Sequence, residues 1–151
     1  MITQKKQTKV IIGGTFDILH RGHHSLLKKA FSLGDWVTIG LTSNQMAKKR
    51  KKREVRDFLL RKKDLVNFIE KKLQASQRYK IVKINDEFGP ALKEDFDYIV
   101  VSPETYNTAV LINQKRRQKK KKPIKIVKIK FVRGENGQPI SSTKLRAQKK
   151  K

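Results

Sequence analysis

The chain has 151 residues, which suits one domain with a hydrophobic core and is too short for two ordinary domains. Its 38 Lys and Arg residues outnumber 13 Asp and Glu residues, and the formal net charge of +25 predicts attraction to polyanions or anionic metabolites. Cysteine is absent, which excludes disulfides, thiolate metal sites and cysteine nucleophiles. Because no apolar run is long enough to cross a bilayer and the N-terminal residues lack the apolar core of a signal peptide, we expect a cytoplasmic protein with no membrane partner.

The first third of the sequence alternates apolar runs with a helical pattern. Residues 9–12 form an apolar run that two adjacent glycines stop, which predicts a buried strand ending in a tight turn. From residue 22 to residue 33, apolar side chains recur at three- and four-residue spacing, which predicts a helix with Gly34 as a left-handed residue past its end. A second strand is predicted over residues 36–41.

The rest of the chain continues this alternation. After a basic loop over residues 48–53, which contains no apolar residue, a long amphipathic helix is predicted from residue 55 to residue 73. Three further strands are predicted, at residues 79–84, 96–102 and 124–132, the last of them an edge strand. A helix that ends in the basic run 115–122 separates the last two strands, and a short helix is predicted over residues 140–146.

Strands that alternate with helices at this spacing predict a Rossmann-like α/β fold. We expect a single domain over residues 1–151, with a basic tail at about 147–151, a five-stranded mostly parallel sheet and helices on both faces. Ligands of such sheets bind beyond the carboxyl ends of the strands. The double-glycine turn follows the first strand, so a site is expected there.

The three histidines of the chain all lie within residues 13–27, "GGTFDILHRGHHSLL". The two glycines allow a ligand to approach the backbone closely, and Thr15 adds a hydroxyl to the turn. His20 and His23 flank the start of a helix, whose free N–H groups favour an anion. Preorganised donors of this kind stabilise a phosphate most when it gains charge during attack on phosphorus. The stretch therefore predicts a phosphate site.

Two other interpretations of the same residues stay open. The glycines are also common turn residues, and the histidines can be surface caps of a helix. The spacing of His20 and His23 could also hold zinc or iron, although the chain has no Cys and no obvious Asp or Glu to complete such a site. We therefore expect no metal-binding residues.

Two further segments are candidates for ligand contact. Ser141, Ser142 and Thr143 offer hydroxyls and backbone N–H groups at a helix start, which is an anion site or an ordinary serine cap. In the helix after residue 102, Tyr106 and Val110 form an apolar stripe that polar residues continue at three- and four-residue spacing. Candidate nucleotide contacts on this helix are Asn113, Arg116 and Arg117.

The stretch "GGTFDILHRGHHSLL" resembles the GTFDxxHxGH motif of the nucleotidylyltransferase superfamily, and "ISSTKLR" resembles its second signature, ISSTxxR. The two signatures occur in the expected order. The double glycine, the segments "VSPET" and "INQKRR" and the short chain are similar to the archaeal-type phosphopantetheine adenylyltransferases over roughly residues 9–147.

This resemblance implies transfer of AMP from ATP, supplied with Mg²⁺, to 4′-phosphopantetheine. The products are dephospho-coenzyme A and pyrophosphate, a step of coenzyme A biosynthesis, and the mechanism is direct in-line attack. The resemblance implies that His23 holds the triphosphate with help from His20, and that Thr15 orients the attacking phosphate. Asp17 is expected to bond backbone amides in the turn rather than a metal.

The resemblance also assigns the remaining site residues. A lysine after the second strand would neutralise phosphates; Lys48 is our choice, and Lys49, Lys51 and Lys52 are alternatives. Acceptor contacts are assigned to Thr15, Lys48 and Phe88. Nucleotide contacts, including those from the helix after residue 102, are assigned to Gly13, Gly14, Phe16, Gly22, Asn113, Arg116, Arg117, Ile140, Ser141, Ser142 and Thr143.

Other functions remain as alternatives. FMN is a possible acceptor within the same superfamily, whereas the segments "GGTFD" and "GQPISST" differ from the patterns typical of nicotinamide-nucleotide adenylyltransferases and cytidylyltransferases. A basic nucleic-acid-binding protein is the alternative from another class. Because aromatic residues are few and are not interleaved with the basic runs, we expect no specific nucleic acid. The pattern does not distinguish a monomer from a homo-oligomer.

Overall fold

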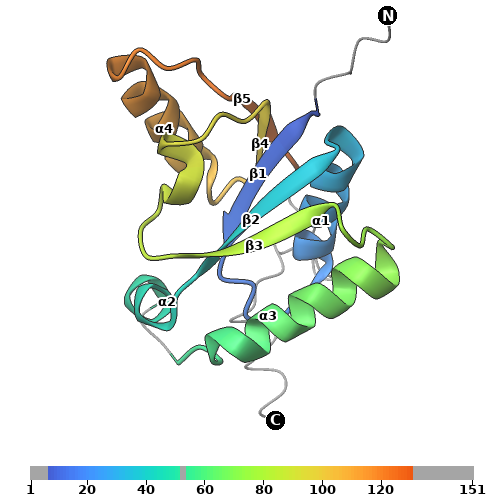
Figure 1. Cartoon of the computed structure of the whole chain (residues 1–151). Coiled ribbons are helices and arrows are strands. Elements are labelled where there is room, and N and C mark those ends of the chain that lie inside the picture. Colours follow the sequence, from blue (N-terminus) through green and yellow to red (C-terminus); the bar gives the residue numbers. More distant parts are fainter. Residues whose placement is uncertain (1–6, 52–53, 131–151) are drawn as a thin grey trace, which may run out of the picture.

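The described strands form one five-stranded sheet with helices against both faces (Figure 1). The computed structural model of the chain describes residues 7–51 and 54–130. The elements are β1 (Lys9–Gly14), α1 (Arg21–Leu33), β2 (Trp36–Thr42), α2 (Asn44–Lys51), α3 (Phe58–Asn67), a π-helix (Phe68–Lys72), β3 (Tyr79–Ile84), a 3₁₀ helix (Gly89–Leu92), β4 (Tyr98–Val101), α4 (Tyr106–Gln118) and β5 (Lys125–Lys128).

The sheet is parallel throughout and has the strand order β3-β2-β1-β4-β5. The chain builds outward from β1 to β3, then crosses back to place β4 and β5 on the other side of β1. The order therefore reverses between β1 and β4, and the crevice beyond their carboxyl ends is where such sheets bind ligands. The predicted parallel α/β sheet is confirmed, and β5 is an edge strand as expected.

The two faces of the sheet carry separate hydrophobic cores because neighbouring strand residues point to opposite faces. Val10 and Ile12 of β1 join the core that α1 and α3 cover, whereas Ile11 joins the core under α4. Both faces of the central strands are thus covered, which explains why their sequences are almost continuously apolar. In the described part of the chain, no helix is long and apolar enough to cross a membrane.

Gly34 differs from its predicted conformation. Its backbone is extended, with φ −125° and ψ 156°, and its N–H bonds to the Ala30 carbonyl. A Cβ at this position would lie 2.5 Å from Cγ2 of Val10 and 3.0 Å from the carbonyl oxygen of Thr8. The glycine therefore permits close packing of the end of α1 against β1 rather than a left-handed turn.

Other expected element boundaries change in particular places. The expected basic loop at 48–53 is wrong for its first residues, because α2 extends to Lys51. The expected helix at 55–73 is confirmed as α3 and its π-helical continuation, starting after the N-cap Asp57. The helix expected at 140–146 and the basic tail lie outside the described residues.

Replacement of Gly34 by Ala tests the packing of α1 on β1. Gly34→Ala should lower the free energy of unfolding by roughly 1–3 kcal/mol, because backbone and a branched side chain must move. Gly13→Ala is the control, since its nearest contact would be the Gly40 carbonyl oxygen at 3.6 Å, an ordinary separation. Urea unfolding measures both variants, and equal loss of stability in the two would contradict this account.

Candidate active site

The turn after β1 is shaped by the packing of Phe16. Phe16 has a positive φ of 48°, which is uncommon for a residue with a side chain, and its ring is 1% exposed within the core. A Cβ on Gly14 would lie 3.1 Å from this ring. Gly14 thus lets the Phe16 ring fold beneath the turn. The Phe16 ring lies in the core with its centroid 5.1 Å from that of His23, and its assignment to a nucleotide pocket stays a prediction.

His20 and His23 stack at the first turn of α1. His20 is the N-cap residue, and its Nδ1 accepts a hydrogen bond of 3.0 Å from the N–H of Gly22. Since Nδ1 accepts, the neutral ring carries its proton on Nε2 and can donate there. The His20 and His23 ring centroids are 3.9 Å apart at an interplanar angle of 24°. A Cβ on Gly22 would lie 2.9 Å from the His20 ring, so this arrangement depends on the glycine.

His24 lies in a different environment from the other two histidines. Its ring stacks on Phe68 of the π-helix, with centroids 4.2 Å apart and planes at 9°. Burial, with a smaller contribution from Lys28, lowers the pKa of His24. The structure therefore separates His24, which packs one helix on another, from the pair at the start of α1.

Arg61 of α3 joins the turn after β1 to the end of β2. Its side chain is fully buried, and burial lowers the pKa of the guanidinium. Nη1 donates to the carbonyl oxygens of Thr15 and Thr42 at 3.0 and 2.9 Å. Nε donates to the Arg56 carbonyl at 2.7 Å, and Nη2 donates to Asn44 Oδ1 at 3.0 Å. One side chain thus sets the relative positions of four separate segments.

A directional hydrogen-bond chain runs from Arg61 to the Thr15 hydroxyl. Arg61 Nη1 donates to Oγ1 of Thr42 at 3.2 Å, and Thr42 Oγ1 donates to Oγ1 of Thr15 at 3.1 Å. Thr42 accepts from the guanidinium, which can only donate, and its own proton goes to Thr15. The Thr15 oxygen therefore accepts, and its own proton is directed to another acceptor. Thr15 is 7% exposed, so it offers this proton from a defined position.

Asp17 holds the same turn from its other side. Its carboxylate is 1% exposed and accepts bonds from the backbone N–H and the Nε of Arg56, both at 3.2 Å. Arg56 also donates through Nη1 to Asp64 at 2.8 Å. Asp17 is expected to bond amides of its own turn, and these bonds join it instead to the segment that leads into α3. Among the described residues, no three His, Asp or Glu side chains are grouped to hold a metal ion.

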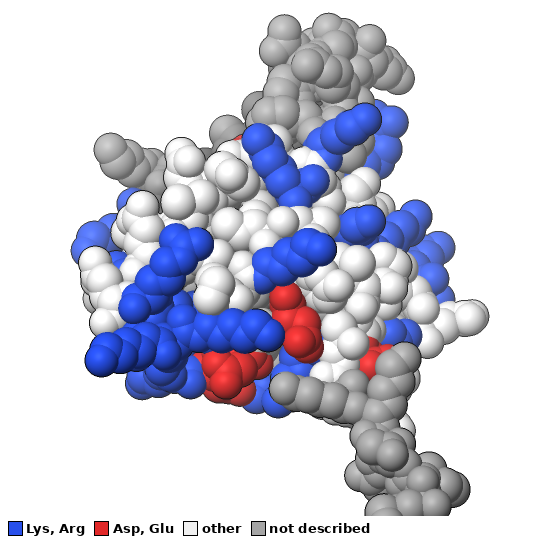
Figure 2. All heavy atoms as spheres, turned by 90° about the horizontal axis from the view of Figure 1, so that it is seen from above, with Lys and Arg blue, Asp and Glu red and all other residues white. Residues whose placement is uncertain are grey.

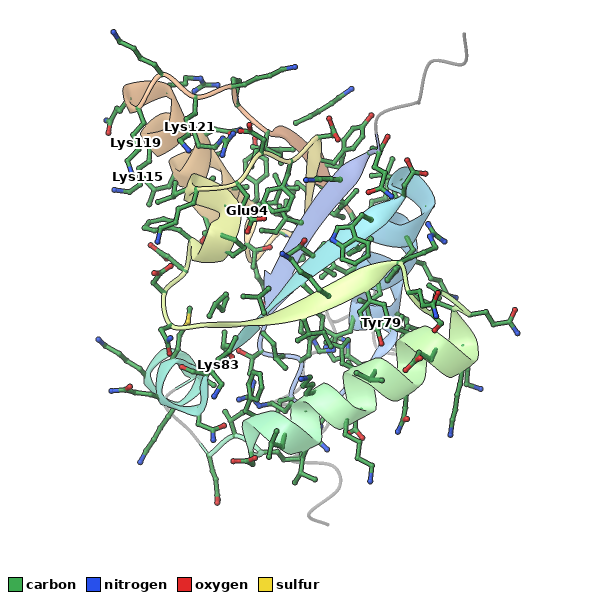
Figure 3. The ribbon with its side chains drawn as sticks, viewed as in Figure 1. Tyr79, Lys83, Glu94, Lys115, Lys119 and Lys121 are labelled. Atoms are coloured by element: carbon green, nitrogen blue, oxygen red, sulfur yellow. The ribbon has the colours of Figure 1, made fainter. Side chains whose placement is uncertain are left out.

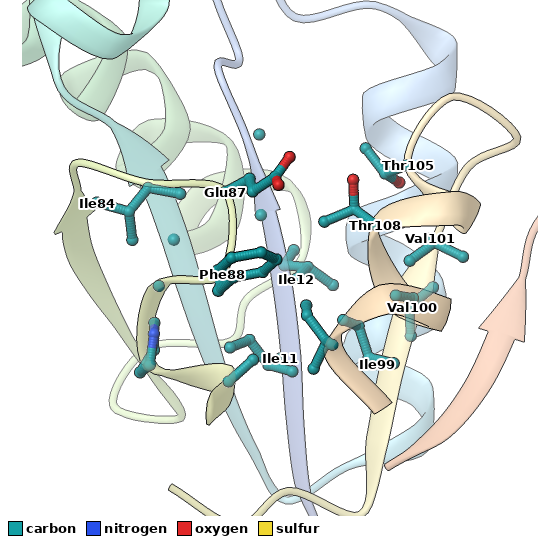
Figure 4. A pocket seen from close by; sticks show the side chains of 18 residues that line it. Ile11, Ile12, Ile84, Glu87, Phe88, Ile99, Val100, Val101, Thr105 and Thr108 are labelled. Atoms are coloured by element: carbon teal, nitrogen blue, oxygen red, sulfur yellow. The ribbon is translucent and has the colours of Figure 1, made fainter. Parts of the chain in front are cut away.

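A pocket opens between α4 and the carboxyl-terminal parts of β1 and β4 (Figure 4). Three glycines of β1 and β2 contribute to its lining, and the rest comes from aliphatic residues of β1 and β4, the loop after β3 and the start of α4. Phe88, expected at the acceptor, lies in the wall formed by the loop after β3. Sequence inspection missed Glu87, Thr105 and Thr108, whose polar groups also line the pocket. The only feature of the sequence that could have identified these three residues is their position after the ends of β3 and β4.

Asn113 and Arg116 make hydrogen bonds within the protein, and their assignment to a nucleotide stays a prediction. The Asn113 amide donates to the Ile124 carbonyl and accepts from the Ile124 N–H, both at 2.8 Å. Arg116 is 1% exposed and donates to the carbonyl oxygens of Ala91, Glu94 and Lys122 and to Asp95. Their polar groups hold backbone segments together. Arg117 is exposed one residue from the end of α4.

The remaining assigned residues are only partly described. Lys48 and Lys49 are exposed on α2, which directly follows the carboxyl end of β2, and their role stays a prediction. Lys51 lies at the end of α2, and Lys52 lies outside the described residues. The predicted anion site formed by Ile140, Ser141, Ser142 and Thr143 also lies outside the described residues.

A parallel sheet with a glycine turn and paired imidazoles at a helix N-terminus defines a nucleotide-binding α/β protein. The cytidylyltransferase-like family model matches residues 11–148. The phosphopantetheine adenylyltransferase of Methanosarcina mazei is 44% identical over 139 residues, covering 91% of this chain and 89% of that protein. The Archaeoglobus fulgidus protein of that name is 44% identical over 139 residues, covering 91% and 92%.

A solved structure agrees with this similarity. The crystal structure of a protein with unknown function from Archaeoglobus fulgidus has a TM-score of 0.74 and 42% identity, covering 81% of this chain and 89% of that chain. The chain therefore belongs to the cytidylyltransferase-like family and, within it, to the phosphopantetheine adenylyltransferases.

Substitution of Arg61 tests whether its guanidinium positions the turn. Arg61→Lys should lower the free energy of unfolding by roughly 2 kcal/mol, because one ammonium cannot satisfy all the acceptors around it. It should also shift the backbone amide resonances of Thr15 and Thr42. Arg78→Lys is the control, since Arg78 donates to the carbonyls of Phe31 and Gly34 at the end of α1. Unchanged Thr15 and Thr42 signals in Arg61→Lys would contradict the positioning role.

Proposed function

We propose that this protein transfers AMP from ATP to 4′-phosphopantetheine, releasing pyrophosphate and forming dephospho-coenzyme A in the cytoplasm. The relatives named phosphopantetheine adenylyltransferase match it over about nine tenths of its length. The observation that carries the assignment to this site is the stacked His20–His23 pair at the N-terminus of α1, beside the glycine turn. This arrangement provides neutral donors and free backbone N–H groups for a polyphosphate.

The histidine pair acts on the leaving group in this proposal. The triphosphate lies against the first turn of α1, where Nε2–H of His20 and an N–H of His23 donate to its oxygens. As the bond from the α-phosphorus to the pyrophosphate breaks, negative charge grows on those oxygens, and fixed donors stabilise it. The 4′-phosphate attacks the α-phosphorus in line from the opposite side. No covalent enzyme intermediate forms, so the residues contribute by positioning and charge stabilisation.

The acceptor enters through the pocket beside β4. The Thr15 oxygen accepts a hydrogen bond from the Thr42 hydroxyl. The Thr15 proton is then available to donate to the attacking phosphate. The largely apolar pocket wall, including Phe88, suits the uncharged pantetheine arm. Lys48 on α2 is placed by this proposal near the phosphates as a neutralising cation. Mg²⁺ enters as part of the ATP substrate, since it binds polyphosphate oxygens and keeps several waters.

A pyrophosphate-release assay with a panel of substrates tests this function. ATP and Mg²⁺ are supplied in parallel with 4′-phosphopantetheine, FMN, nicotinamide mononucleotide or glycerol 3-phosphate, and CTP replaces ATP in a second series. We expect release with ATP and 4′-phosphopantetheine alone. Release with another pair would change the substrate assignment, and no release with any pair would contradict adenylyl transfer.

Single histidine variants test the division of roles within the cluster. His23→Ala should lower kcat by about 10²–10³, the range for loss of one transition-state donor, while the fold persists. His24→Ala should leave kcat nearly unchanged and lower thermal stability, because it removes only the stack on Phe68. Steady-state kinetics and thermal unfolding measure both. Similar kcat losses in the two variants would show that the roles are assigned wrongly.

A further inference from the structure

A basic ridge lies at the end of the molecule opposite to the candidate active site. The ridge consists of exposed or partly exposed cations at the end of α4 and in the adjoining connections, namely Lys93, Lys115, Arg117 and Lys119–Lys122. α4 starts beyond the carboxyl end of β4 and ends shortly before Lys125, where the parallel strand β5 begins. The ridge therefore lies mainly where the strands start, away from the histidine pair, and Lys115 alone reaches the pocket wall, where its Nζ lies 5.3 Å from the centroid of the Phe88 ring.

The pictures agree with this placement. Figure 3 shows the labelled side chains of Lys115, Lys119 and Lys121 together at the end of α4. Figure 2 looks onto the end of the molecule where β1 starts and shows Lys and Arg side chains gathered on the side of α4. In the proposed reaction the triphosphate binds at the first turn of α1, at the other end of the sheet from Lys119–Lys122.

The carboxylates beside the ridge are engaged with other partners. Asp95 accepts from Arg116 at 2.7 Å, and Glu94 lies 3.8 Å from Lys80. Within residues 7–51 and 54–130, no ion pair joins a carboxylate to a ridge side chain. One ridge contact is internal, since Lys121 Nζ donates to the Lys93 carbonyl at 3.1 Å. The ridge thus presents positive charge that the described acids do not neutralise.

The composition of the ridge indicates the kind of partner. Lysine is depleted in protein–protein interfaces, which need an apolar or aromatic centre, and no exposed large apolar side chain lies within residues 115–122. Non-specific binding of single strands depends on aromatic side chains that stack on bases, which the ridge also lacks. Lysine side chains can bind the regularly spaced charges of a phosphate backbone without an apolar centre and without stacking aromatic side chains. We propose that the basic ridge binds the phosphate backbone of double-stranded nucleic acid without sequence preference.

Two charge-matched variants test this proposal in the full chain. One carries Lys119→Glu, Lys121→Glu and Lys122→Glu on the ridge, and leaves Lys115 in place because it contacts Phe88. The other carries Lys62→Glu, Lys63→Glu and Lys71→Glu, which are exposed positions on α3 and the π-helix. Each lowers the formal net charge from +25 to +19, because each of three substitutions replaces a positive charge with a negative one and so lowers the charge by two. Because both variants have the same net charge, a difference between them distinguishes binding at the ridge from the general attraction of a basic protein to nucleic acid.

Fluorescence anisotropy with a short labelled DNA duplex of mixed sequence measures binding from about 50 to 200 mM salt. We expect the ridge variant to weaken binding about tenfold or more and to reduce the slope of log K against log salt by about 2–3, whereas the α3 variant changes both far less. Circular dichroism and pyrophosphate release check that both variants fold.

Two outcomes would overturn the proposal. Equal weakening in both variants, or none in either, would show that the ridge is not the binding surface. Polyglutamate that displaces the duplex at equal charge concentration, with the same dependence on the ridge, would identify an acidic polypeptide as the partner instead.

Discussion

The buried guanidinium of Arg61 is the constraint on which the candidate site depends. A fully buried arginine keeps its charge, and removing the acceptors around it would leave that charge unpaired at a high energetic cost. The carbonyls of Thr15, Thr42 and Arg56 must therefore remain around it. These carbonyls belong to the ends of β1 and β2 and to the segment before α3. Arg61 thus fixes the backbone beyond the last hydrogen bonds between the strands, as far as the turn that precedes the histidine pair.

A second buried arginine performs a comparable structural task under α4. Arg116 gathers the carbonyls of Ala91, Glu94 and Lys122, and so fixes the connection that forms one side of the pocket. The short strands β4 and β5 offer few ladder bonds, so their connections need other donors. The rigid turn, the pocket and the first turn of α1 can then meet at one edge of the sheet, where preorganised donors are most effective.

The fold was predictable from the sequence, and the candidate site could be placed after β1, because both rest on short-range patterns. Apolar runs and glycines marked β1 and its turn, and histidine spacing marked the start of α1. The roles of Asn113 and Arg116 were not predictable, because a polar pair on a helix face can serve either a ligand or a distant backbone segment. α2 was missed since its sequence is rich in lysine, and Met46 and Ala47 are its buried apolar residues among those described. The role of Gly34 was not predictable from the sequence, because it depends on a contact with Val10, which is distant in the sequence.

The central claim is that a nucleotide triphosphate binds where the turn after β1 meets the first turn of α1. Titration of isotopically labelled protein with ATP and Mg²⁺, followed by NMR of the imidazole and glycine amide signals, tests it most directly. The account predicts saturable shifts of His20, His23, Gly13 and Gly14, with much smaller shifts of His24. Saturable shifts confined to α4 and the basic ridge would contradict it, because ATP would then bind at the opposite end of the sheet.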